Sequence, residues 1–95
     1  MKIKEAVNII NSTKTARACL EKENIFFYEN LVDSSDYFFM MPSKANSWDD
    51  VDDDYNALYS TTPKDLACVM DVIQRLLDTP VKERFPEKSY LLVAK

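Results

Sequence analysis

The chain has no histidine and no glycine among its 95 residues, and these absences exclude many familiar catalytic and nucleotide-binding motifs. Without histidine there is no imidazole for a Ser/His/Asp or Cys/His relay, and none to bind a metal. Without glycine there is no P-loop, dinucleotide-binding fingerprint or nucleophile elbow, because each requires a positive backbone φ or a close approach to the ligand. We therefore expect a protein that is not an enzyme, with no catalytic residue, no cofactor and no metal site.

Cysteine is also scarce. Cys19 and Cys68 lie among apolar residues in segments that are predicted to be helical, so we expect two reduced thiols in the core. A disulfide or a redox site is the alternative. The sequence has no charged start followed by an apolar run and no span of about 18 apolar residues. We therefore expect a cytoplasmic protein without a membrane segment.

Length and charge point to one small acidic domain, residues 1–95. A chain of this size buries about 60–65% of its unfolded surface, which allows one modest core. Hydrophobic residues make up 46% of the chain and the net charge is −4, a sign that opposes nucleic-acid binding. The acidity is local, because residues 26–65 carry nine acidic and two basic side chains.

Two helical segments are predicted. Residues 3–23 show helical spacing, with an interruption at residues 11–13 that indicates a bend or a second short helix. The second segment starts at Thr62, a typical N-cap, followed by Pro63 at the first helical position, and it ends at Thr79. The apolar stripe that it predicts consists of Leu66, Val69, Met70, Ile73, Leu76 and Leu77.

Aromatic runs at residues 25–32 and 37–41 predict a β-hairpin around the polar residues 33–36. A turn without glycine favours type I geometry built on aspartate and serine. Pro42 ends the second strand because it has no N–H to donate to a neighbouring strand.

Two further strands are expected, at residues 55–61 and 90–94. The predicted fold class is therefore α+β, in the order α-β-β-β-α-β, with an antiparallel sheet and the helices packed on one face.

An acidic run follows the predicted hairpin. It contains Asp49, Asp50, Asp52, Asp53 and Asp54, with Trp48 before them and Tyr55 after them. An EF-hand starting at Asp50 would require glycine in place of Tyr55 and glutamate in place of Thr61, so a tight calcium site is not expected. Acid–base catalysis would require a pocket that a solvated run lacks. The two alternatives are a solvated loop and an acidic patch that competes for a basic partner with the phosphates it normally holds.

A helix-turn-helix within residues 5–24 is the opposite hypothesis. In that arrangement Lys14, Thr15 and Arg17 would face the major groove of DNA. The missing turn glycine, the few basic residues and the acidic chain all oppose it. An ordinary bent helix is the alternative, and we do not expect direct nucleic-acid binding.

The predicted hairpin is apolar on both faces, and helices on one side can cover only one of them. The other face would expose aromatic side chains that soluble monomers usually cover. We expect the acidic loop, the C-terminal segment, a second copy of the chain or another protein to cover it. The side chains expected on this association face are Phe26, Tyr28, Phe38 and Met40.

Residues 76–90, LLDTPVKERFPEKSY, resemble the ends of short accessory proteins of phages and prophages of Gram-positive bacteria. A helix followed by an aromatic hairpin is similar to small toxin-immunity proteins. Both classes act by occluding another protein. These resemblances imply an inhibitor in the bacterial cytoplasm, either a counter-defence protein of the anti-CRISPR kind or a toxin-neutralising immunity protein. Its predicted partner-binding residues are Trp48, Tyr55 and the five aspartates between them, and a homodimer is left open.

Overall fold

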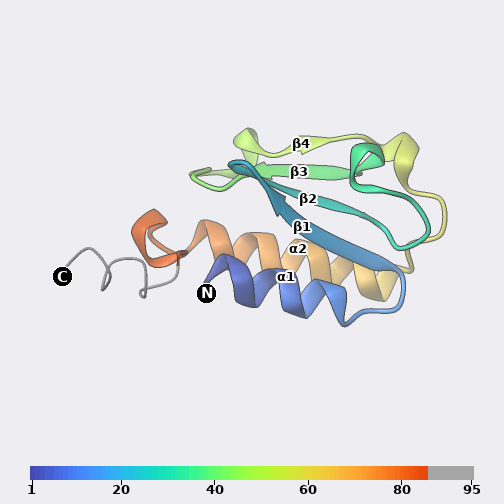
Figure 1. Ribbon diagram of the computed structural model, residues 1–95, viewed down its shortest axis with the longest axis horizontal. Helices are drawn as coiled ribbons and strands as arrows, with labels where there is room; N and C mark the ends of the chain where they lie inside the picture. Colours follow the sequence, from blue (N-terminus) through green and yellow to red (C-terminus); the bar gives the residue numbers. More distant parts are fainter. Residues whose placement is uncertain (86–95) are drawn as a thin grey trace.

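The structure, a computed structural model, describes residues 1–85. A four-stranded antiparallel sheet with the strand order β1-β2-β3-β4 is covered on one face by two helices (Figure 1). The elements are α1 (Ile3–Asn11), β1 (Ala16–Glu21), β2 (Asn24–Glu29), β3 (Phe39–Pro42), β4 (Asp52–Asp53) and α2 (Pro63–Leu77), with short 3-10 helices η1 (Ser34–Asp36), η2 (Trp48–Asp50), η3 (Tyr55–Ala57) and η4 (Val81–Glu83). The predicted α+β class, with an antiparallel sheet and helices on one face, is confirmed.

Of the helical prediction for residues 3–23, only the part up to Asn11 is a helix, and the prediction is wrong beyond it, because Ala16–Glu21 form β1. Ala16 and Ala18 are buried, whereas Arg17 and Cys19 between them are only half-buried, as expected for alternate faces of a strand. Pairing with β2 along the whole of β1 outweighs the weak helical spacing of the sequence. The helix-turn-helix of the opposite hypothesis therefore lacks its second helix.

Two side chains, one in the last residue of α1 and one in the loop after it, form hydrogen bonds with the free edge of β1. The Asn11 amide accepts a hydrogen bond from the Ala18 N–H (2.8 Å) and donates one to the Ala18 carbonyl (3.1 Å). The Thr13 hydroxyl accepts from the Ala16 N–H (3.2 Å) and donates to the Ala16 carbonyl (3.0 Å). These side chains form hydrogen bonds with backbone N–H and carbonyl groups of β1 that could otherwise pair with another strand.

The predicted hairpin is confirmed as the pair β2–β3, but its connection is longer than expected. Residues 30–38 join the strands and contain η1, where the Asp33 carboxylate accepts a hydrogen bond from the Ser35 N–H (3.1 Å). β3 ends at Pro42, as predicted. The first hairpin, between β1 and β2, turns through Lys22, whose φ is +57°.

The strand predicted at residues 55–61 is wrong. Tyr55–Ala57 form η3, because the Asp54 carboxylate accepts from the Asn56 N–H (3.1 Å) and starts a 3-10 turn instead of an extended strand. The fourth strand lies just before it and has two residues. The predicted strand at residues 90–94 lies outside the described residues.

α2 begins where the sequence predicts. The Thr62 hydroxyl accepts a hydrogen bond from the Asp65 N–H (3.2 Å), and Pro63 is the first helical residue. The predicted apolar stripe is buried or half-buried except for Met70, which is exposed, and Val72 is buried in addition. Within residues 1–85, neither helix combines the length and the apolar character that crossing a membrane would require.

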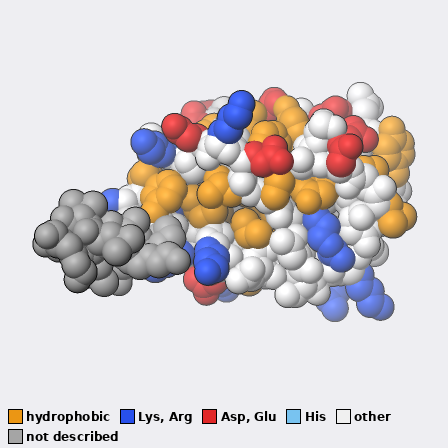
Figure 2. Space-filling model, in the orientation of Figure 1, with side chains coloured by type: hydrophobic (Ala, Val, Ile, Leu, Met, Phe, Trp, Pro, Cys, Tyr) orange, Lys and Arg blue, Asp and Glu red, His pale blue; other side chains and the backbone are white. Residues whose placement is uncertain are grey.

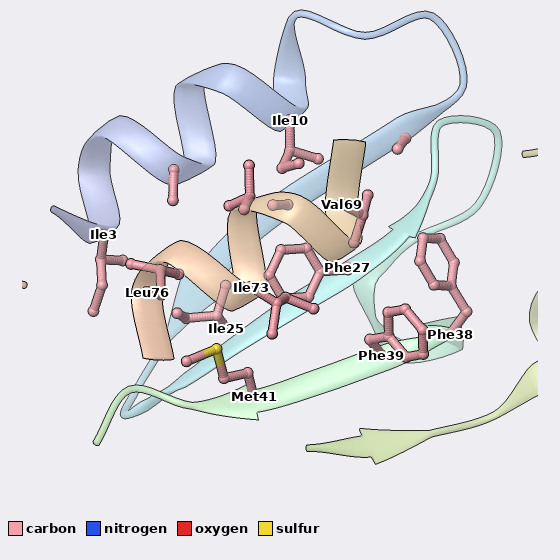
Figure 3. Packing of buried hydrophobic residues seen from close by; sticks show 14 of the residues in the cluster. Ile3, Ile10, Ile25, Phe27, Phe38, Phe39, Met41, Val69, Ile73 and Leu76 are labelled. Carbon is pink, nitrogen blue, oxygen red and sulfur yellow. The ribbon is translucent and has the colours of Figure 1, made fainter. Parts of the chain in front are cut away.

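The core lies between the two helices and the inner face of the sheet (Figure 3). Side chains from α1 and α2, among them Ile10 and Ile73, meet Phe27 of β2 there. Phe38, which was predicted for the association face, is fully buried, with its ring centroid 5.3 Å from that of Phe39. It precedes β3 and so escapes the strand alternation, which lets two consecutive rings enter the core.

Candidate functional site

The five predicted aspartates lie along η2 and β4 and at the start of η3, beside the open edge of the sheet. All five are exposed, and with Trp48 and Tyr55 they form a surface that we call the acidic edge. Most acidic side chains in view lie over the part of the molecule that holds β3 and β4 (Figure 2). The structure therefore places the predicted partner-binding residues along one edge of the sheet.

The acidic edge is attached to the core at several points. Ala45 and Ala57, which flank it, are buried, and Val51 in its middle packs against the core. The Trp48 indole N–H donates to the Gln74 side-chain carbonyl on α2 (2.7 Å). These contacts hold the run in place and distinguish it from the freely solvated loop that was the alternative.

Three of the five carboxylates accept local hydrogen bonds. The donors are the Asn46 N–H to Asp50 (2.9 Å), the Tyr37 hydroxyl to Asp52 (2.9 Å) and the Asn56 N–H to Asp54 (3.1 Å). Asp49 and Asp53 accept none from the residues that the structure describes. The carboxylates thus have separate neighbours, and no group of three or more acidic, cysteine or histidine side chains within residues 1–85 is placed to hold a metal ion.

No carboxylate of the acidic edge forms an ion pair within the described residues. No lysine or arginine occurs between Lys44 and Lys64. The one ion pair in the described part of the chain joins Arg75 to Asp71 on α2 (3.2 Å). The acidic edge therefore presents a concentrated negative potential to solvent.

The remaining predicted association residues lie on the face of the sheet opposite the helices, which we call the outer face. Phe26, Tyr28 and Met40 are half-buried there, because their strand neighbours Ile25, Phe27 and Met41 point into the core. The ring of Tyr37 lies 5.4 Å from that of Phe26 and covers part of this surface.

A buried carboxylate, Glu29, was not singled out from the sequence. It is 3% exposed and accepts hydrogen bonds from the backbone N–H groups of Tyr59 (2.9 Å), Ser60 (2.8 Å) and Thr61 (2.7 Å). Burial acts to raise the pKa of Glu29, but these bonds and one from the Thr61 hydroxyl outweigh it, so the pKa lies below its ordinary value. Strand alternation could have identified this residue, because it follows Ile25 and Phe27 at every second position.

Asp65 is a second buried carboxylate, in the first turn of α2. It accepts hydrogen bonds from the hydroxyl and the N–H (2.9 Å) of Thr15. The hydroxyl bond, above all, holds the pKa of Asp65 below its ordinary value. Together, Glu29 and Asp65 fasten the start of α2 and the loop before it to the sheet, which is a structural task.

The two thiols are free in the structure. Cys68 lines an open hollow of about 500 Å³ between the end of α1 and the start of α2, and Cys19 lies in β1 and not in the predicted helix. Burial raises the pKa of both thiols. Both are therefore protonated at neutral pH, whereas an activated nucleophile has a lowered pKa.

No protein-family model, curated protein or solved structure matches the chain. The geometry of the acidic edge is therefore the basis for the functional interpretation.

Proposed function

We propose that the protein is a non-catalytic binder that inhibits or modulates another protein, one whose basic surface normally holds nucleic acid. The carboxylates of the acidic edge take the place of phosphates on that surface. The observation that carries this proposal is a run of exposed carboxylates that is attached to the core and has no ion pair within the described residues.

Aromatic side chains at both ends of the run support the same function. Trp48 is 38% exposed and Tyr55 is 61% exposed, although both rings contact the body of the protein. Aromatic residues with one free face are enriched in the centres of protein interfaces. Charge would steer the partner to the acidic edge, and these rings would then supply contact area.

The resemblance of residues 76–90 to phage accessory proteins supports a function in the bacterial cytoplasm. Proteins of bacterial defence that bind nucleic acid are the class of partner that we propose, which makes the chain a counter-defence protein of the anti-CRISPR kind. The strand β1 in place of a recognition helix disfavours direct DNA binding.

Capture from a bacterial lysate tests the proposal with two matched variants. Asp49→Asn with Asp53→Asn removes two charges from the acidic edge and keeps its three local hydrogen bonds. Glu21→Gln with Glu23→Gln removes the same charge at the β1–β2 turn, outside the acidic edge. We expect the captured protein to be displaced by duplex DNA, and its affinity to fall about tenfold for the first variant only. Equal affinities for the two variants, or capture that DNA does not affect, would contradict the proposal.

A further inference from the structure

An open groove lies between the start of α1 and the end of β1. Most of the residues that line it are apolar, and the full set is Ile3, Lys4, Val7, Asn8, Leu20 and Phe85. Leu20 is 44% exposed there. The volume of the groove, about 240 Å³, is smaller than the roughly 300–1,000 Å³ of typical small-molecule sites. The groove therefore suits a few apolar side chains better than a cofactor or a substrate.

The edge of β1 is open beside this groove. The backbone groups of Ala16 and Ala18 point away from β2 and form hydrogen bonds with Thr13 and Asn11. Leu20 is the next residue with this orientation, because successive residues of a strand alternate in the direction of their backbone groups. The side chains that bond to Ala16 and Ala18 do not reach it, so its N–H and carbonyl have no partner within residues 1–85. An extended segment of chain would satisfy both groups.

The described part of the chain ends at this groove. The Arg84 carbonyl accepts a hydrogen bond from the Ile3 N–H (2.7 Å), and the Phe85 carbonyl accepts one from the Lys2 ammonium (3.2 Å). These bonds hold residues 84 and 85 beside the start of α1 (Figure 1). Residues 86–89 are polar or proline and span about 13 Å when extended. Residues 90–93, Tyr-Leu-Leu-Val, are apolar and have high strand propensity, and they follow within reach of the groove.

We propose that residues 90–93 bind in this groove as an extended segment that pairs with the backbone of Leu20. Opposite residues on neighbouring strands point to the same face of a sheet, so the residue paired with Leu20 directs its side chain toward α1 and fills the groove. A short tether gives the segment an effective concentration of about millimolar, which favours it over a second copy or another protein. The proposal is independent of the function of the acidic edge.

Hydrogen exchange of single amides, followed by NMR in the full chain, tests this pairing. Leu91→Ser with Leu92→Ser removes the apolar side chains, and we expect the Leu20 N–H to exchange about tenfold faster. Glu87→Ser with Lys88→Ser is the matched control, which keeps residues 90–93 and should leave the rate unchanged. The Ala18 N–H, bonded to Asn11, should exchange equally in both variants and so reports that the fold is intact. Equal exchange of the Leu20 N–H in the two variants overturns the proposal.

Two further measurements on the unchanged chain identify the occupant and its place. Nuclear Overhauser contacts should join side chains of residues 90–93 to the methyl groups of Val7 and Leu20. Contacts with Met40 instead would place the segment on the outer face and overturn the proposal. Protection of the Leu20 N–H should not change with protein concentration, because the segment belongs to the same chain. Protection that rises with concentration would indicate a second copy and would also overturn it.

Discussion

At the scale of single residues, one buried carboxylate, that of Glu29, is bound by the loop before α2. Glu29 accepts hydrogen bonds from three consecutive N–H groups before α2. Glu29→Gln keeps the shape but removes the negative charge that these donors surround. We expect it to lower the free energy of unfolding by about 2–3 kcal/mol, measured by urea denaturation. Glu23→Gln, at an exposed position, is the control, and equal stability of the two variants would contradict this role.

The lowered pKa of Glu29 predicts how the free energy of unfolding depends on pH. The pKa values of Glu29 and Asp65 are lowered in the folded protein, so between the folded and unfolded pKa values the unfolded chain binds more protons. Their contribution is complete above the ordinary pKa, about 4 for carboxyl groups, and is lost as the pH falls through the folded values. Unfolding measured from pH 7 to pH 2 should show a shallower acid loss for Glu29→Gln. If Glu29→Gln loses stability with falling pH as steeply as the unchanged protein, the Glu29 carboxylate is not the source of the acid sensitivity.

At the scale of elements, the turn between β1 and β2 has a strained backbone, because the chain has no glycine to occupy it. Lys22 has a φ of +57°, a region that favours glycine. We expect Lys22→Gly to raise the free energy of unfolding by up to about 1 kcal/mol, because it relieves the contact between Cβ and the backbone. Glu23→Gly, at the next position, has no such strain to relieve and should be neutral or destabilising. A thermal unfolding series that ranks the two the other way would contradict this explanation.

The elements that could be predicted are those in which the local sequence favours the same secondary structure that packing in the fold requires. Thr62 and Pro63 determine the start of α2 locally, and the aromatic runs of β2 and β3 have high strand propensity. β1 could not be predicted, because Ala16, Cys19 and Leu20 fit a helical spacing, and only pairing with β2 makes the segment a strand. The two-residue β4 is defined by its partner β3 alone.

The candidate site was predictable in its composition but not in its geometry. The sequence identified the aspartates, whereas their positions follow from contacts with distant residues, such as Gln74 for Trp48 and Tyr37 for Asp52. Phe38 was misassigned because strand alternation was extended beyond the strand. Buried Glu29 was overlooked, although that same alternation, applied to β2, places it inside.

At the scale of the whole molecule, the two edges of the sheet are protected in different ways. The β1 edge is occupied by Asn11 and Thr13, whereas the β4 edge is short and carries Asp52 and Asp53. Short, charged edge strands resist pairing with other chains. The acidic edge therefore discourages strand addition while it offers charge to a partner that binds through side chains.

The most direct test of phosphate mimicry is the salt dependence of binding to the captured partner. Its dissociation constant for the chain should be measured between about 50 and 300 mM salt, for the unchanged protein and for Asp49→Asn with Asp53→Asn. We predict that the unchanged protein binds more weakly as salt rises, and that the variant shows a shallower dependence. Parallel salt dependences for the two proteins would contradict the claim that these carboxylates replace phosphates.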